Sequence, residues 1–423
     1  MAQSTSEFFS EQGFVPARLG QRLADEGRVQ LGHDGRPYRY LEGVYRPDAA
    51  SWAAGQVRDL LGERYRRRHL DEVMSWLKAT QPTIPLEQPI EFLNLNSGLL
   101  DWSSGNVRPH DPAALSTIRI PHRWNPEAKS PATDAFLIEV LPGDAIDFLL
   151  EVIGHCLIPD NRLQRSVMLV GPGGNGKGTL LNLIRALLGP ANVSARSLHA
   201  LAENKFAAAD LVGKLANVCG DLDARAIERS DVFKMVTGGD VMSGEHKFGH
   251  AFTFVPFCRL LFSANEVPPS ADQTRAYFDR WLPVPMTCRF RGTEQEDPDL
   301  LRKLTAEAEL EGLLVQAVEA LRRLMKRGHF DIPASVKGEA ARFQEHVDTV
   351  IAFLGDSCEV DLTAWTSRRE LYTAYTRWCG ANGRRPLASR NVYSKLLEQL
   401  PSLTERPRQG VRGFTGLRVA AGA

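Results

Sequence analysis

One nine-residue segment constrains the fold of this chain more than any other. Residues 171–179 read Gly-Pro-Gly-Gly-Asn-Gly-Lys-Gly-Thr, between the apolar run SVMLV at residues 166–170 and the helically spaced stretch LLNLIRALLG at residues 180–189. A glycine-rich turn that joins a buried strand to a helix is typical of a phosphate-binding loop. Further apolar runs at residues 215–219 and 260–263 alternate with helical stretches, which predicts an α/β fold on a parallel sheet.

The loop carries the chemistry expected of a nucleotide site. Its glycines let backbone N–H groups converge on phosphate oxygens, and the following helix adds the positive end of its dipole. Lys177 supplies a mobile positive charge for the β and γ phosphates. The alternative is a glycine-rich turn that joins strand and helix and binds no ligand. We expect the loop to bind ATP through Gly171, Pro172, Gly173, Gly174, Asn175, Gly176, Lys177, Gly178 and Thr179.

The position after Lys177 departs from the usual pattern. A serine or threonine normally stands there and holds Mg²⁺, but this chain has Gly178, and Thr179 comes one place late. Thr179 is therefore the candidate hydroxyl ligand of Mg²⁺.

Polar residues follow the next two predicted strands. Asp221 and Asp223 come directly after residues 215–219, at a spacing that places both carboxylates on one face. Carboxylates there can hold Mg²⁺ and orient an attacking water, and Asp221 is the preferred metal ligand. A surface turn is the bland alternative, and a two-metal nucleotidyl-transfer site is another. Asn265 follows the strand at residues 260–263 and can position water against a γ phosphate, although an Asn at the end of a strand usually stabilises a turn.

Three further features point to subunit or DNA contacts. Arg280 could act as an arginine finger toward a neighbouring subunit, although such an arginine is usually a surface ion pair. His246 and Lys247 lie in a basic turn between residues suited to a hairpin, whose tip could touch nucleic acid. A helix, turn, helix and basic hairpin end the chain, which indicates either DNA binding or a docking face. Its candidate phosphate contacts are Arg384, Arg385, Arg390, Lys395, Arg408 and Arg412.

Composition excludes several classes of protein. The 423 residues carry 51 basic and 51 acidic side chains, so no global field attracts nucleic acid or lipid. No apolar run approaches the length of a membrane span, and the first residues lack a signal-peptide pattern. The six cysteines are scattered, without a zinc-knuckle spacing. We expect a protein of the cytoplasm that contacts no membrane.

Taken together, these motifs resemble superfamily 3 helicases, in particular the helicase portion of the phage and plasmid primase-helicases, which are related to the poxvirus proteins. The resemblance runs through GPGGNGKGT as Walker A, VCGDLD as Walker B, LLFSANEVP as sensor 1 and YFDRW with its arginine. It implies an N-terminal accessory domain at residues 1–135, an AAA+-like P-loop ATPase at 136–330 and a winged-helix-like DNA-binding domain at 331–423.

The resemblance also implies an activity. The protein would be an ATP-driven ring, commonly a hexamer, that moves along single-stranded DNA and unwinds replication-fork or origin duplexes. Arg280 would complete the neighbouring site, Lys247 would grip the strand, and a separate primase could be a partner. Gly178, and Trp281 in place of a second arginine, depart from the pattern. Primer synthesis is not predicted, because no zinc knuckle or separate acidic cluster precedes the ATPase.

Other interpretations stay open from the sequence alone. A P-loop kinase would act on a small acceptor, and a GTPase would need a base-reading motif that Ala207 interrupts. An ATP-switched initiator or loader would bind DNA without unwinding it. A DNA-binding protein with an inactive loop is the last alternative, and it would turn over no nucleotide.

Overall fold

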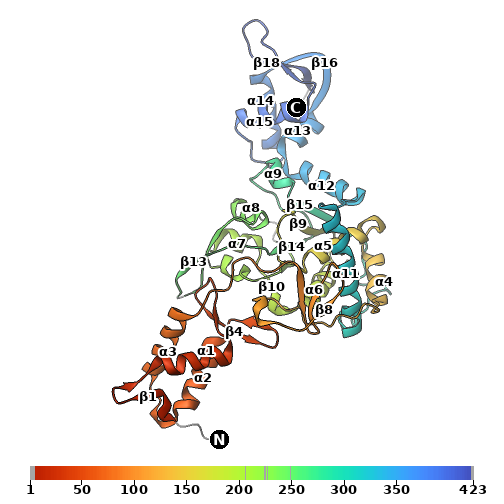
Figure 1. The fold of residues 1–423 in the computed structure, drawn as a ribbon. Helices are drawn as coiled ribbons and strands as arrows, with labels where there is room; N and C mark the ends of the chain where they lie inside the picture. Colours follow the sequence, from red (N-terminus) through yellow and green to blue (C-terminus); the bar gives the residue numbers. More distant parts are fainter. Residues whose placement is uncertain (1–4, 205, 223–224, 226, 248, 421–423) are drawn as a thin grey trace.

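The computed structural model describes residues 5–204, 206–222, 225, 227–247 and 249–420. Figure 1 shows the N-terminal helices and the C-terminal unit at opposite ends of the molecule, with the largest sheet between them. Within the described ranges, every helix is too short or too polar to cross a lipid bilayer.

The N-terminal unit is a small helical bundle flanked by short strands. Leu19, Val57 and Val73 lie in one buried cluster that joins its three helices. The charged stretch from residue 51 to 77, which reads as helical, forms two helices because the backbone turns at Gly62, where φ is +47°. The elements of this unit are η1 (Thr5–Phe8), β1 (Phe9–Ser10), β2 (Gly13–Phe14), α1 (Pro16–Gly27), β3 (Gln30–Leu31), β4 (Pro37–Leu41), β5 (Val44–Arg46), α2 (Ala49–Leu61), η2 (Gly62–Arg64) and α3 (Arg67–Thr80).

A five-stranded parallel sheet forms the centre of the molecule. Its spatial order is β10-β11-β14-β9-β15, so β9 lies between two strands that follow it in sequence. The three strands predicted from the apolar runs are confirmed to within a residue at each end. All carboxyl ends meet at one edge of the sheet. The strands are β9 (Ser166–Val170), β10 (Val193–Ser194), β11 (Ala216–Cys219), β14 (Arg259–Ala264) and β15 (Trp281–Pro285).

Helices cover both faces of this sheet, and the pleat decides which side chain faces which layer. Val167 and Leu169 lie in one buried cluster with α5, α6 and α11, whereas Met168 and Val170 lie in a second cluster with α7 and α8. The covering helices are α4 (Pro131–Val140), α5 (Ile146–His155), α6 (Lys177–Leu188), α7 (Leu198–Glu203), α8 (Asp231–Gly238), α9 (Arg275–Phe278), α10 (Leu300–Leu304), α11 (Glu307–Arg327) and α12 (Ala334–Val347).

Short elements connect these layers. A three-stranded antiparallel sheet precedes α4, and an antiparallel hairpin lies between β11 and β14 in the sequence. These elements are β6 (Phe92–Leu95), β7 (Gly98–Asp101), β8 (Val107–Arg108), β12 (Met242–Glu245), β13 (Ala251–Phe254), η3 (Pro112–Ala114), η4 (Gly143–Ala145), η5 (Pro190–Asn192) and η6 (Ala208–Leu211).

The C-terminal unit has its own core of helices against a three-stranded antiparallel sheet, ordered β16-β18-β17. Both helices predicted there are confirmed, and a basic hairpin joins β17 to β18. Its elements are α13 (Thr349–Ser357), β16 (Cys358–Ser367), α14 (Arg368–Ala381), α15 (Ser389–Gln399), β17 (Thr404–Glu405) and β18 (Gly413–Val419).

One buried cluster extends from Leu93 to Val336 and so spans both predicted boundaries, at 135/136 and 330/331. Leu93 and Ile120 belong to the buried cluster on one face of the central sheet, and the α12 residue Phe343 belongs to the buried cluster on the other face. The separate C-terminal cluster begins at Val350. The three-domain division itself stays a prediction.

Candidate functional site

The glycine-rich loop closes tightly between β9 and α6. At Gly171, φ is +153°, and a Cβ atom would lie 2.0 Å from the Met286 carbonyl oxygen. At Gly176, φ is +89°, and a Cβ would lie 2.9 Å from Val140. Neither position accepts a side chain in this conformation. The close approach of the segment after β15 is therefore part of what shapes the loop.

Lys177 starts α6 and turns its ammonium group back into the loop. Its Nζ donates hydrogen bonds to the carbonyl oxygens of Gly171 (2.6 Å) and Pro172 (2.9 Å), and to the amide oxygens of Asn175 (3.1 Å) and Asn265 (3.2 Å). Burial lowers the pKa of Lys177, and the nearby Asp221 carboxylate raises it by less. The loop therefore holds a partly desolvated positive charge between uncharged oxygens, which a phosphate anion could replace as partners.

Asp221 and Asn265 lie near Lys177 because β14 pairs with β9 and β11 pairs with β14, so the three carboxyl ends lie in succession along the sheet. The Asp221 N–H donates to Ser263 Oγ at 3.1 Å, which ties the end of β11 to β14. Asp221 has a φ of +48°, a conformation that a non-glycine residue seldom adopts. The sequence placed Lys177, Asp221 and Asn265 after three separate predicted strands, and the structure brings them together. Asp223 lies outside the described residues.

These residues line a cavity of about 570 Å³, which we call the loop cavity. The other wall is a segment that sequence reasoning missed: the backbone N–H groups of Phe290 and Arg291 donate to the Gly174 carbonyl at 2.8 and 3.2 Å. The acidic run at residues 294–299 was the available signal. Two cationic and four acidic side chains line the cavity, namely Lys177, Arg291, Glu139, Asp221, Glu296 and Asp297.

The donor set of the loop cavity fits a hard cation that shares its coordination with phosphate. Thr179 and Asp221 both line it, and they offer a hydroxyl and a carboxylate oxygen. Among the described residues no group of three or more acidic, histidine or cysteine side chains is placed to hold a metal by itself. Around Gly178 there is open space, with no atom within 4 Å of a Cβ built there.

Arg280 lies at the other edge of the sheet. Its carbonyl oxygen accepts from the Ser166 N–H at 2.7 Å, at the amino end of β9, whereas the loop follows the carboxyl end. Five residues of strand separate these ends, a rise of about 16 Å. The Arg280 side chain donates to Thr237 Oγ1 (3.1 Å) and the Ala276 carbonyl (2.6 Å). It does not line the loop cavity of its own chain.

The predicted basic hairpin forms between β12 and β13, with Lys247 exposed in its turn. His246 differs from the expectation of an open tip. Its ring lies 5.1 Å from that of Phe252, and its Nε2 lies 3.8 Å from Asp34 of the N-terminal unit. His246 is therefore half-buried at the contact between the hairpin and this unit.

The basic residues of the C-terminal unit differ in their surroundings. Arg385, Arg390, Arg408 and Arg412 are exposed, the last two in the hairpin between β17 and β18. Arg384 is half-buried, with its guanidinium 5.2 Å from the Trp378 ring centre. Lys395 instead forms an ion pair with the buried Asp348, which caps α13. The ion pair gives Lys395 a structural role and weighs against the predicted phosphate contact.

Three family models match successive stretches of this chain. "D5 N terminal like" matches residues 35–142, "Family of unknown function (DUF5906)" matches 169–280, and "Poxvirus D5 protein-like" matches 345–411. A protein of Acanthamoeba polyphaga mimivirus, named "Putative helicase L207/L206", is 22% identical over an alignment of 325 residues, and the match covers 70% of this chain. The chain spans about a third of that relative, 34% of its length.

Solved structures of the NrS-1 C-terminal region share the fold. Two apo structures superpose with TM-scores of 0.53 and 0.51, each at 12% identity, over 95% of this chain and 99% of theirs. Family matches and fold thus agree along the chain. By these matches the chain is similar to D5-like proteins in its N-terminal and C-terminal parts, and it shares the fold of the NrS-1 C-terminal region.

Proposed function

We propose that this chain is an ATP-dependent DNA helicase of superfamily 3. The observation that carries the proposal is the meeting of Lys177, Asp221 and Asn265 in one cavity at the carboxyl ends of β9, β11 and β14. The strand order β10-β11-β14-β9-β15 supports an AAA+-like P-loop core, because the loop follows an inner strand, and the strands that lead to Asn265 and Asp221 are the next two on one side of it. The relative named as a helicase supports the activity.

Four residues of the loop cavity then have chemical roles. Lys177 would exchange its carbonyl partners for the β and γ phosphates of ATP, and the loop N–H groups would hold the remaining phosphate oxygens. Asn265 would orient the attacking water. Thr179 and Asp221 would hold Mg²⁺, which neutralises charge on the phosphates when bound.

The position of Arg280 supports a ring. A side chain about one strand length from its own loop cavity, at the opposite edge of the sheet, cannot reach the γ phosphate there. In a head-to-tail ring this edge can face the loop cavity of the next subunit. We therefore propose a homo-hexamer in which Arg280 acts in trans, Lys247 contacts single-stranded DNA, and the C-terminal unit is a winged helix that binds DNA through its exposed arginines.

The test is ATP hydrolysis with and without single-stranded DNA, by the unsubstituted protein and by Lys177→Ala and Arg280→Ala. We expect each variant to lose roughly 10²–10³-fold in turnover, because each removes a charge aimed at the transition state. Arg275→Ala is the matched control, since Arg275 is exposed and its side chain forms an i,i+4 ion pair with Asp279. It should retain full turnover.

Mixing the two inactive variants tests the action in trans. A Lys177→Ala subunit still offers Arg280, and an Arg280→Ala subunit still offers Lys177, so an equal mixture should regain about a quarter of the turnover when interfaces act independently. No recovery in a mixture that assembles would overturn the ring proposal. Turnover without strand displacement on a forked duplex would instead favour an ATP-switched initiator or loader.

A further inference from the structure

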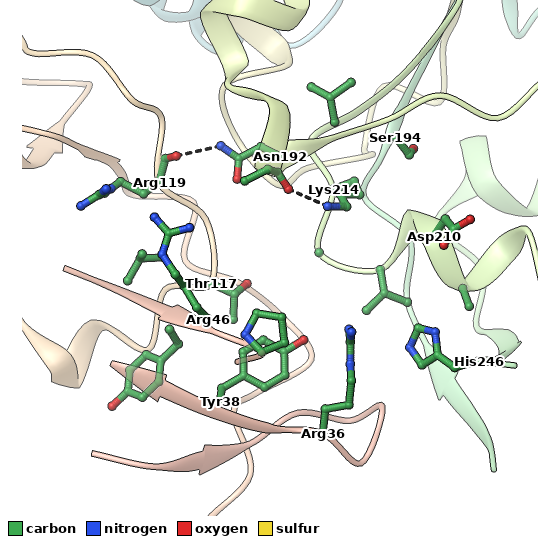
Figure 2. A pocket seen from close by; sticks show the side chains of 18 of the residues that line it. Arg36, Tyr38, Arg46, Thr117, Arg119, Asn192, Ser194, Asp210, Lys214 and His246 are labelled. Atoms are coloured by element: carbon green, nitrogen blue, oxygen red, sulfur yellow. Dashed lines mark hydrogen bonds between the residues drawn. The ribbon is translucent and has the colours of Figure 1, made fainter. Parts of the chain in front are cut away.

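A second cavity, of about 610 Å³, lies where the N-terminal unit meets the central sheet; we call it the junction cavity. One wall is the hairpin of β4 and β5, and the other is the edge strand β10 with the turn before β11. Figure 2 shows Arg36, Arg46 and Lys214 pointing toward the same space from these walls. The walls are tied together, because Asn192 Nδ2 donates to the Arg119 carbonyl at 2.8 Å.

The lining of this cavity is strongly basic. Five cationic side chains and one carboxylate line it, together with His246; they are Arg36, Arg46, Arg119, Arg196, Lys214 and Asp210. The surplus is local, because the whole chain has no net charge. A concave surface with one sign of charge concentrates counter-ions of the other sign.

Nearby carboxylates neutralise only part of this charge. Arg36 pairs with Asp34 at 2.5 Å, Arg196 donates to Asp210 at 2.6 Å, and Arg119 pairs with Glu42 at 3.3 Å.

Two cations of the junction cavity lack such a partner. Within the described ranges, neither Arg46 nor Lys214 forms an ion pair, and both are half-buried. Lys214 Nζ donates to the Ala191 carbonyl at 2.6 Å, and burial lowers its pKa. A half-buried cation without a carboxylate partner gains a charge-assisted hydrogen bond when an anion binds beside it.

We propose that the junction cavity binds phosphate groups of a single-stranded DNA backbone, with Arg46 and Lys214 as the principal contacts. Arginine offers a planar fork for phosphate oxygens and lysine a mobile point charge. His246 lines this cavity and directly precedes Lys247 of the hairpin turn, so a strand held by the hairpin can continue into it. The inference rests on the proposed helicase function and extends its DNA path to the N-terminal unit.

The experiment measures binding of a fluorescein-labelled 20-mer of deoxythymidine by fluorescence anisotropy over a range of salt. Arg46→Ala/Lys214→Ala should raise Kd about tenfold and reduce the salt slope by about 1.4, since each contact to a single strand contributes about 0.7. The matched control is Arg58→Ala/Lys326→Ala, which removes the same charge from exposed positions. It should bind like the unsubstituted protein.

Three further measurements separate the possible causes: DNA binding by a charge-conserving variant, the thermal unfolding of each variant, and pyrophosphate binding. Arg46→Lys/Lys214→Arg keeps both charges and should retain tight binding, and the thermal unfolding midpoint of each variant reports whether it folds. Equal DNA affinity and slope in the folded double-alanine variant would overturn the inference while leaving ATP turnover, and hence the proposed function, untouched. Loss of pyrophosphate binding without any change in DNA binding would also overturn it, by assigning the cavity to a free phosphate ligand.

Discussion

The loop cavity and the junction cavity are similar in size and opposite in charge. The first is lined by two cations and four carboxylates, the second by five cations and one carboxylate. A triphosphate in the loop cavity would meet more negative than positive charge, so we expect it to enter together with a metal cation. A phosphodiester in the junction cavity meets cations directly. Both cavities are therefore expected to bind phosphate groups, the loop cavity together with a metal cation and the junction cavity through its own cationic side chains.

Removing divalent metal should cause the largest difference between the two cavities, because ATP turnover should depend on the metal and DNA binding should not. With excess EDTA we expect ATP turnover to fall by at least about 10³-fold, because charge on the phosphates is no longer neutralised. Binding of single-stranded DNA by the Lys177→Ala variant, measured by anisotropy, should change less than about twofold, because its contacts are arginine and lysine.

Adding back Mg²⁺ is the control for this prediction and should restore turnover. Equal loss of DNA binding in EDTA would contradict the comparison, since it would place a metal-dependent contact in the DNA path as well.

Monovalent salt should weaken DNA binding more than it weakens ATP binding. Raising monovalent salt from 50 to 200 mM should weaken DNA binding roughly 50-fold if about four phosphates are contacted. Affinity for Mg²⁺-ATP, followed with a fluorescent ATP analogue, should weaken only a few-fold, because the phosphates arrive already neutralised in part and the cavity is partly shielded from solvent. Similar salt slopes for both ligands would show that the charge difference between the cavities does not control binding.

The loop cavity was largely predictable from sequence, and the junction cavity was not. Apolar runs and glycine spacing fix where β9 ends and α6 begins, and parallel pairing then brings Asp221 and Asn265 to Lys177. The junction cavity joins Arg46 and Lys214, whose stretches carry no motif and meet only because the N-terminal unit packs on the edge of the sheet. No local sequence pattern predicts that these two stretches lie side by side.

The same limit explains the other differences. Lys395 reads as one more basic residue of a helix, and only the packing of α15 against the start of α13 pairs it with Asp348. His246 reads as a hairpin tip until Asp34 of a distant segment lies beside it. The segment through Phe290 and Arg291 carries no known motif, although its N–H groups contact the glycine loop. Long-range packing decided these positions.

Gly178 offers the finest test of the metal route. A serine there would place a hydroxyl after Lys177, where the usual loop has its Mg²⁺ ligand, and nothing lies within 4 Å of the added Cβ. Gly178→Ser should lower the Mg²⁺ concentration for half-maximal ATP turnover by about two- to fivefold. Gly338→Ser is the matched control, because Gly338 is also helical with open space around it, and it should leave that concentration unchanged. DNA affinity should stay constant in both variants, since neither touches the junction cavity. If Gly178→Ser leaves the Mg²⁺ requirement unaltered or raises it, Thr179 and Asp221 already complete the protein's share of the metal site, and the departure from the usual loop carries no cost.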